Sequence, residues 1–202
     1  ISMFISSTMM ISTILIFSFI TFYELNRLIF KIIKKRIFRF LISGSILLYL
    51  FIFVFIILFV ESTQFLVPKY KMFIFYSIIV CVNSDLGGFF FGKIFKGKKL
   101  TKISPNKTIS GSIGSFITSL FTIPIFIGDL SFINLNLLIL ITLIISFMSQ
   151  LGDLFVSYIK RLAKVKDTGS ILPGHGGILD RIDGIIFAVP IGFFLLNLIS
   201  II

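Results

Sequence analysis

Charged residues are scarce in this sequence. They make up 13% of the 202 residues, whereas an ordinary soluble domain is about a quarter charged. The chain is 57% hydrophobic, with a mean hydropathy of +1.13, and this composition excludes a soluble globular protein. A membrane-crossing helix needs about 20 apolar residues. Runs of this kind are predicted at Ile1–Tyr23, Phe40–Val60, Met72–Phe91, Ile109–Gly128, Phe132–Leu151 and Gly184–Ile202.

The apolar runs do not alternate with polar residues, as the strands of a membrane barrel would. The sequence therefore predicts an all-α fold, a polytopic transmembrane helical bundle of about six spans. No domain boundary is visible, so residues 1–202 are interpreted as a single integral membrane domain. The first run lacks a basic start and a small-residue cleavage site, which favours a transmembrane helix over a signal peptide.

Cysteine, tryptophan and alanine are also rare. Cys81 is the only cysteine, so no intrachain disulfide can form, and its place in an apolar run indicates a packing role. Tryptophan is absent and alanine occurs only at Ala163 and Ala188. These two biases carry no functional information.

Acidic residues are few, but basic residues are not: 8 Asp and Glu stand against 19 Lys and Arg. All the cations except Lys69 and Lys71 follow the first, third or fifth predicted span. Positive residues mark the cytoplasmic side of a membrane and attract anionic lipid headgroups. We therefore expect three cytoplasmic segments, with both termini outside, in a cell (inner) membrane. A nucleic-acid reader would concentrate its charge on one soluble face, so nucleic acid is not an expected partner.

Half of the acidic residues lie in one polar segment, residues 153–183. If the chain is helical as it leaves the membrane, Asp153, Ser157, Lys160 or Arg161, and Lys164 share a face. A carboxylate there can hold a hard cation through oxygen, and the cations can hold phosphate. The alternative is a salt-bridged helix next to the membrane.

The centre of this segment, Leu172–Gly177, is rich in proline and glycine. It cannot form a regular helix, and its backbone N–H groups can converge on an anion. His175, the only histidine, either contacts phosphate or metal there or is a structural hydrogen-bonding residue. Asp180 and Asp183 then share a helix face at the mouth of the last span. Acids at that depth are costly unless they bind cations, or unless they pair with Arg181 or Lys166.

A second polar segment lies upstream, at residues 83–115. Asp85 stands inside an apolar run, and an acid in a membrane is by default a functional candidate. Glycines at positions 87, 88 and 92 allow close approach of another backbone, and residues 104–108 form a turn rich in hydrogen-bond donors. Helix packing next to a solvated basic loop is the alternative interpretation.

The polar segment contains a long fixed pattern. It reads Ser157-x-Ile159-Lys160-Arg161-x4-Lys166-Asp167-x-Gly169-x2-Leu172-Pro173-x-His175-Gly176-Gly177-Ile178-x-Asp180-Arg181-Ile182-Asp183. This pattern resembles the signature of the phosphatidate cytidylyltransferases, the CDP-diacylglycerol synthases. The upstream blocks Asp85 to Gly92 and Ile103 to Gly111 are similar to that family's upstream motifs, and the resemblance covers Asn83 to the end. The residues before Asn83 are interpreted as merely hydrophobic.

Several positions depart from that family. Its members commonly carry Glu at the position of Val156 and Glu or Gln at that of Ser110, and an Ala-Tyr pair where this chain has Gly88-Phe89. Members also usually have more spans at the N-terminus.

The resemblance implies an enzyme that joins CTP and phosphatidate, giving CDP-diacylglycerol and pyrophosphate, with its catalytic cavity in residues 83–202. It implies Mg²⁺ on Asp153 and Asp180, and leaves open a second cation, monovalent or divalent, and a homodimer. The implied partners are CTP, phosphatidate and membrane lipids. The implied catalytic residues are Asp153, Lys160, Arg161, Lys166, Asp167, His175, Asp180, Arg181 and Asp183. The implied substrate-binding residues are Asp85, Ser104, Lys107, Thr108, Ser157, Gly176 and Gly177.

Two other functions stay open. One is a CTP-dependent lipid kinase of the polyprenol or phytol type, which would transfer the γ-phosphate to a hydroxyl; the complete pattern from His175 to Asp183 argues against it. The other is a non-catalytic remnant of the family, or a carrier.

Overall fold

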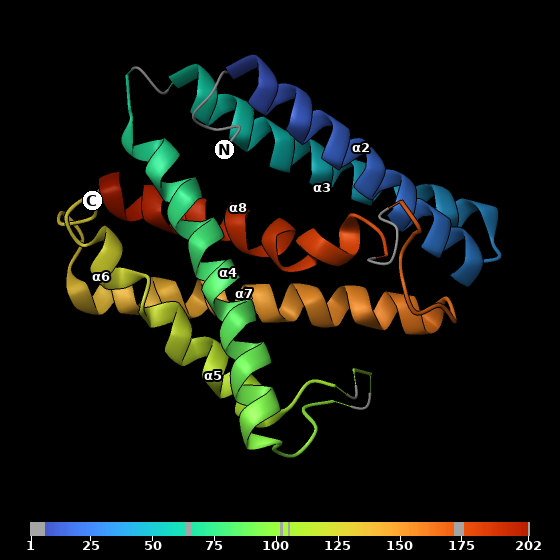
Figure 1. Ribbon diagram of the computed structural model, residues 1–202. Coiled ribbons are helices and arrows are strands. Elements are labelled where there is room, and N and C mark those ends of the chain that lie inside the picture. Colours follow the sequence, from blue (N-terminus) through green and yellow to red (C-terminus); the bar gives the residue numbers. More distant parts are fainter. Residues whose placement is uncertain (1–6, 64–65, 102, 105, 172–175, 202) are drawn as a thin grey trace. The chain divides into compact units, whose positions relative to one another are not determined.

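The computed structural model describes residues 7–63, 66–101, 103–104, 106–171 and 176–201, and most of these residues lie in helices. The helices are α2 (Ser7–Ile32), α3 (Arg36–Thr63), α4 (Lys69–Phe95), α5 (Ile109–Leu120), α6 (Ile123–Phe126), α7 (Leu135–Leu162) and α8 (Leu179–Ile201) (Figure 1). Two compact units share this chain. The first comprises Ile1–Thr63 and Tyr158–Ile182, and the second comprises Gln64–Ser157 and Asp183–Ile202.

The prediction of an all-helical protein with six spans is confirmed. Within the described residues, six segments are long and apolar enough to cross a membrane. Most helices run further than predicted, however. The segment after the first predicted span is not a loop, because Arg27 and Lys31 lie in α2 and only residues 33–35 join it to α3. Lysine and arginine are good helix formers, and their apolar stems can lie along a helix while the charge reaches water.

The fourth span is interrupted. α5 ends at Leu120 and the short α6 begins at Ile123. Pro124 stands at the start of α6, and a proline inside a continuous helix would remove a backbone hydrogen bond and clash with the preceding turn. The chain therefore starts a new helix at this point, where proline is tolerated.

In the first unit, the end of α7 is closed by a Schellman motif. The Val165 N–H donates to the Lys160 carbonyl and the Lys164 N–H to the Arg161 carbonyl, both at 3.0 Å. Lys164 takes the left-handed conformation, with φ of 56°. Val165 then packs on a buried cluster that includes Leu28 of α2. This reversal directs the chain into the loop of residues 163–178, which is called the signature loop below.

In the second unit, α4 and α5 lie in close contact. A Cβ added to Gly111 would lie 2.8 Å from the Gly88 carbonyl oxygen, so the two backbones can meet here only because position 111 is glycine. Ser115 Oγ donates to the Ser84 carbonyl at 2.7 Å. Small residues and interhelical hydroxyls are typical of helix packing inside a membrane, and the close backbone approach predicted for the glycines is confirmed.

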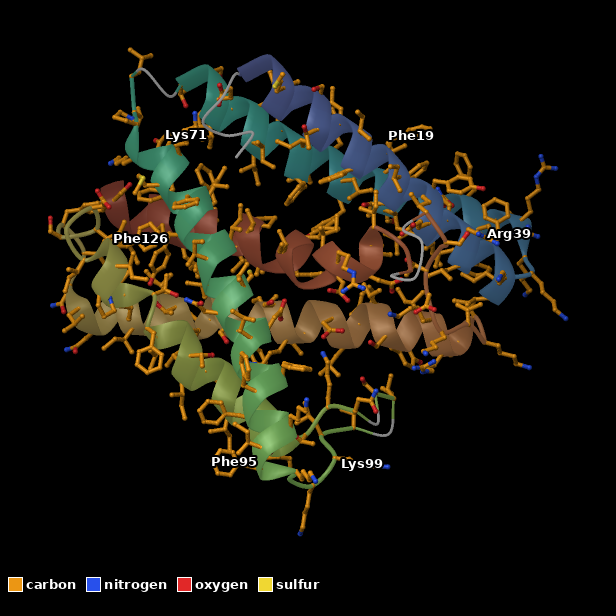
Figure 2. All side chains as sticks on the ribbon, in the orientation of Figure 1. Phe19, Arg39, Lys71, Phe95, Lys99 and Phe126 are labelled. Atoms are coloured by element: carbon orange, nitrogen blue, oxygen red, sulfur yellow. The ribbon has the colours of Figure 1, made fainter. Side chains whose placement is uncertain are left out.

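Large apolar side chains cover the outside of the helices. Phe19 is 74% exposed, Phe40 79% and Phe95 64%, and Phe19 and Phe95 project from α2 and α4 (Figure 2). An apolar surface of this extent is stable against lipid tails rather than water.

Candidate functional site

A polar cavity of about 360 Å³ lies in the second unit. Residues of α4, α5, α7 and the connector between α4 and α5 line it. Five residues that the sequence predicts for the site are among them: Asp85, Ser104, Lys107, Thr108 and Asp153. The upstream polar segment is therefore brought together with the start of the downstream one.

The connector between α4 and α5 places Lys107 at this cavity. The chain doubles back on itself, with the Leu100 N–H donating to the Lys107 carbonyl at 2.8 Å and the Ile109 N–H to the Lys98 carbonyl at 2.9 Å. Thr108 is the N-cap of α5 and accepts a hydrogen bond from the Gly111 N–H at 3.0 Å. Such a cap satisfies a backbone donor that the first helical turn leaves unpaired.

The ammonium of Lys107 forms an ion pair with the carboxylate of Asp153. The two side chains are 26% and 35% exposed, so water reaches the pair. On the other carboxylate oxygen, Asp153 accepts a long 3.4 Å hydrogen bond from Ser157. Asp85, an exposed residue of α4, lines the same cavity, which therefore holds two acids and one base.

The sequence interpretation missed two further polar residues of the cavity. Ser112 donates a hydrogen bond of 2.5 Å to the side-chain oxygen of Gln150, and both residues line the cavity. Gln150 is a polar residue at the end of an apolar run, so a signal was present in the sequence. Val156 and Ser110 stand where family members commonly carry Glu or Gln. Val156 is buried, with 1% exposure, and the Ser110 hydroxyl forms a hydrogen bond of 3.1 Å with the Thr108 hydroxyl.

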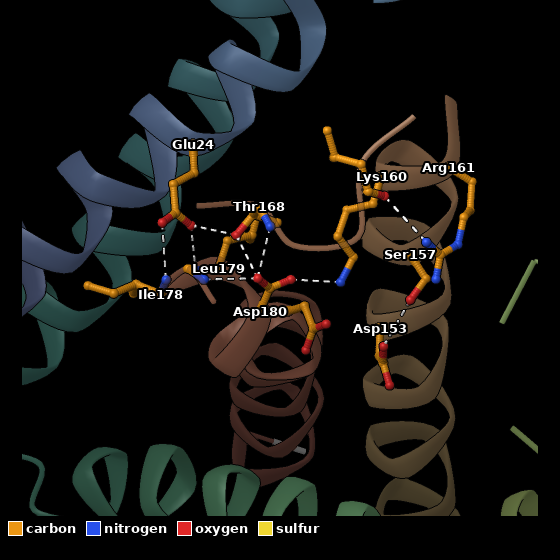
Figure 3. Close-up of polar contacts among 12 residues, drawn as sticks. Glu24, Asp153, Ser157, Lys160, Arg161, Thr168, Ile178, Leu179 and Asp180 are labelled. Carbon is orange, nitrogen blue, oxygen red and sulfur yellow. Dashed lines mark hydrogen bonds and ion pairs between the residues drawn. The ribbon is translucent and has the colours of Figure 1, made fainter. Parts of the chain in front are cut away.

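In the first unit, Asp180 is held by several groups at once (Figure 3). Its Oδ1 is 2.6 Å from the Lys160 ammonium. Its Oδ2 accepts hydrogen bonds from the Thr168 N–H at 2.9 Å and the Gly177 N–H at 3.0 Å, and lies 3.0 Å from the Thr168 hydroxyl oxygen. Asp180 thus pairs with Lys160. The sequence analysis considered Arg181 and Lys166 as ion-pair partners, but not Lys160.

These surroundings decide how well each acid suits Mg²⁺. Mg²⁺ is usually held by one or two carboxylates together with substrate phosphates and water. Asp153 fits such a role, because its carboxylate is water-accessible and Asp85 lies in the same cavity. Asp180 fits only if Lys160 is displaced, since its other oxygen already accepts hydrogen bonds from two backbone N–H groups. No cluster of three His, Cys, Asp or Glu ligands occurs within the described residues.

Glu24 of α2 is the main residue that the sequence interpretation missed. It is only 1% exposed. Its Oε1 accepts a hydrogen bond from the Ile178 N–H at 3.1 Å, and its Oε2 accepts from the Leu179 N–H at 2.9 Å and the Thr168 hydroxyl at 2.8 Å (Figure 3). The interpretation of the residues before Asn83 as merely hydrophobic was wrong. The signal was similar to the one applied to Asp85, because Glu24 directly follows the apolar run Ile1–Tyr23, and an acid at a membrane is a functional candidate.

Glu24 also explains two glycines of the signature loop. A Cβ on Gly169 would lie 2.6 Å from Oε1 of Glu24, and one on Gly177 would meet the same carboxylate. Both positions therefore have to lack a side chain for the loop to close on Glu24.

The other predicted residues have varied surroundings. Arg161, Lys166, Asp167 and Arg181 are exposed, while Ser157 and Gly177 are buried and Gly176 has the left-handed φ of 85°. Asp167 lines a cavity of about 200 Å³ together with Arg27 and Lys31 of α2. Asp183 accepts a hydrogen bond from the Gly184 N–H at 2.9 Å. His175 lies outside the described residues, and Asp153 and Asp180 belong to different compact units.

Comparison with known proteins extends the sequence resemblance. The model of the Cytidylyltransferase family matches residues 1–199, well beyond the motifs after Asn83. A phosphatidate cytidylyltransferase of Bacillus subtilis (strain 168) is 47% identical over 131 residues, which are 63% of this chain and 48% of the relative. Proteins of the same name from Staphylococcus haemolyticus (strain JCSC1435) and Staphylococcus aureus (strain COL) are each 46% identical over 132 residues, 64% of this chain and 49% of the relative. The chain spans about half the length of the curated relatives it matches.

Proposed function

This chain belongs to the cytidylyltransferase family, and from that premise we propose that it transfers the cytidylyl group of CTP to phosphatidate. The products are CDP-diacylglycerol and pyrophosphate. The observation that carries the proposal is the polar cavity of a membrane protein whose charged lining consists of Asp85, Lys107 and Asp153. That lining suits a phosphate together with a cation, and the relatives at 46–47% identity are named phosphatidate cytidylyltransferase.

In the proposed reaction, a phosphate oxygen of phosphatidate attacks the α-phosphorus of CTP. A new oxygen–phosphorus bond forms, the bond from the α-phosphorus to the bridging oxygen breaks, and pyrophosphate leaves with that electron pair. A phosphate monoester is already ionised near neutral pH, so a strong general base is not required. Catalysis depends on positioning two anions and on stabilising their charge.

The Lys107–Asp153 ion pair gives the chain a way to bind both charges. When a substrate phosphate enters, the Lys107 ammonium binds it, and the Asp153 carboxylate is released to hold a cation. Mg²⁺ is the cation that we propose, with Asp153 as the residue of the polar cavity that would hold it. The family resemblance adds Asp180 as a ligand, which would first have to exchange its bond to Lys160. When bound, Mg²⁺ would neutralise phosphate charge and act as a Lewis acid. Lys160, Arg161 and Lys166 are proposed to bind phosphate oxygens, and His175 to contact a phosphate.

The protein is an integral membrane protein with six candidate spans among the described residues. We place it in the cell membrane with the catalytic residues on the cytoplasmic side, because the basic residues gather in the segments that contain these residues. CTP, phosphatidate and membrane lipids are the proposed partners, and nucleic acid is not one of them. A homodimer and a second cation remain part of the hypothesis drawn from the family.

The test is an assay of the purified chain with phosphatidate vesicles and CTP carrying ³²P at the α or the γ position. Transfer of α label into lipid, dependent on Mg²⁺, is the expected result. Transfer of γ label to a polyprenol would instead identify the lipid kinase, and no transfer of either label would identify the remnant. Asp129→Asn is the matched control for acidic variants, because Asp129 is exposed and does not line the cavity.

A further inference from the structure

A further cavity, of about 540 Å³, lies in the first unit between the end of α2 and the start of α3. Its lining is Asn26, Phe30, Arg36, Arg39, Phe40 and Ser43. None of these residues belongs to the signature or to the polar cavity described above. Two of the six are arginines and none is acidic, so the cavity has a net positive charge.

Three of the residues that line this cavity each have a buried polar atom with no hydrogen-bond partner within the described part of the chain: Oδ1 of Asn26, Nε of Arg39 and Oγ of Ser43. A buried polar group without a partner costs free energy, and native proteins rarely leave several together. A ligand with complementary groups would remove this cost. The two donors, an arginine N–H and a serine O–H, suit phosphate oxygens, and the Asn26 oxygen suits a hydroxyl donor.

The side chain of Arg39 is already fixed in position. Its Nη2 donates to the Lys34 carbonyl at 2.7 Å, and its guanidinium carbon lies 5.1 Å from the centre of the Phe30 ring. Arg39 stands where α2 and α3 meet (Figure 2). The Nε–H is a further donor of this fixed side chain that has no partner within the described residues, so an anion binding there does not have to order the side chain first.

The surroundings indicate a lipid rather than free phosphate. Phe30 is 58% exposed and Phe40 is 79% exposed, so both can contact acyl chains beside the cavity. The cavity lies at the ends of two candidate membrane spans, where headgroups are found. We propose that this cavity binds the headgroup of an anionic phospholipid. Its phosphate would contact Arg36, Arg39 and Ser43, and a headgroup hydroxyl such as that of phosphatidylglycerol would contact Asn26.

The test is a titration of the purified chain in detergent with dioleoylphosphatidylglycerol, with one-to-one binding followed by native mass spectrometry. Because the measurement is lipid binding, it does not depend on the proposed transferase activity. Arg39→Gln is expected to weaken binding about tenfold or more, since a hydrogen bond to a charged group is lost. Ser43→Ala keeps every charge and is expected to weaken binding about threefold or more. Lys35→Gln removes the same charge from the neighbouring connector, outside the cavity, and is expected to change binding less than about twofold.

Three results would overturn the proposal. Equal losses for Lys35→Gln and Arg39→Gln would mean diffuse electrostatic attraction. Equal binding of dioleoylphosphatidylcholine would mean that the anionic headgroup is not recognised, and displacement of the lipid by millimolar inorganic phosphate would identify a phosphate site.

Discussion

At the scale of single residues, two lysine–aspartate pairs differ in their surroundings. Lys107 and Asp153 are 26% and 35% exposed, whereas Lys160 and Asp180 are 13% and 10% exposed. Exposed ion pairs contribute little to stability, but breaking a buried pair leaves an uncompensated charge. The first pair is therefore suited to exchange its partners, and the second to hold a structure together.

This difference gives a prediction for two isosteric variants. Asp153→Asn and Asp180→Asn are both expected to reduce turnover at least about tenfold, because each removes a proposed cation ligand. Only Asp180→Asn is expected to destabilise the fold, by about 3–5 kcal/mol, since Lys160 then stays buried without a counter-charge. Asp153→Asn is expected to cost less than about 1 kcal/mol. Thermal unfolding in detergent, alongside the CTP assay, separates the two effects; equal destabilisation would contradict the assignment.

Glu24 carries a second prediction at this scale. Glu24→Gln replaces one acceptor oxygen by an NH₂ group that cannot accept from the N–H donors facing Glu24. We expect turnover to fall about tenfold or more, because a hydrogen bond to a charged group contributes about 1.5–3 kcal/mol. Amide hydrogen exchange at Thr168, Ile178 and Leu179 should become faster.

The matched control for this variant is Glu61→Gln, since Glu61 is another buried acid of the first unit, at 7% exposure. It should leave exchange in the signature loop unchanged. If Glu24→Gln lowered stability without faster exchange in the loop, Glu24 would be a general core residue rather than one that positions the loop.

At the scale of helices and loops, hydrophobic runs predicted the six spans but not their ends. The apolar run predicts a span that ends at Leu151, but helix α7 continues to Leu162. Backbone hydrogen bonding does not stop where the side chains become polar. The shared face of Asp153 and Ser157 was predictable from helical spacing. The hydrogen bond from the Leu179 N–H to Glu24 was not predictable, because no local sequence pattern links positions that are 155 residues apart.

The contact between α4 and α5 gives a prediction at this scale. Gly111→Val would put branched carbons against the Gly88 carbonyl, 2.8 Å from the position of the first added atom. Overpacking of this kind costs about 1–3 kcal/mol, and the helices would have to separate at the wall of the polar cavity. Gly44→Ala is the control, because a Cβ there meets nothing within 4 Å and should stabilise α3 by about 0.5–1 kcal/mol. Denaturant unfolding followed by helical circular dichroism measures both; equal stability of the two variants would contradict the prediction.

At the scale of the whole molecule, the distribution of charge predicts the orientation in the membrane. The chain has a net charge of +11, and the cations lie at alternate ends of successive spans. Cysteines introduced at Lys35, Lys98 and Lys164, in a Cys81→Ser background, should resist an impermeant thiol reagent in intact cells. A cysteine at Leu66, which is 84% exposed, should react. Labelling of positions 98 or 164 from outside would show that the predicted topology is inverted. The proposed CTP site would then lie on the outer side of the membrane instead of the cytoplasmic side.

The first unit is assembled from two stretches that are far apart in the chain, and this affects the biogenesis of the protein. Glu24 is inserted with the first span, but its partner Thr168 is translated 144 residues later. At ribosomal rates of about 5–20 residues per second, the delay is roughly 7–30 s. For that time the Glu24 carboxylate, which follows the apolar run Ile1–Tyr23, lacks its native donors, and an acid at a membrane is costly without partners. Completion of the signature loop is therefore the step at which Glu24 gains its native hydrogen-bond donors.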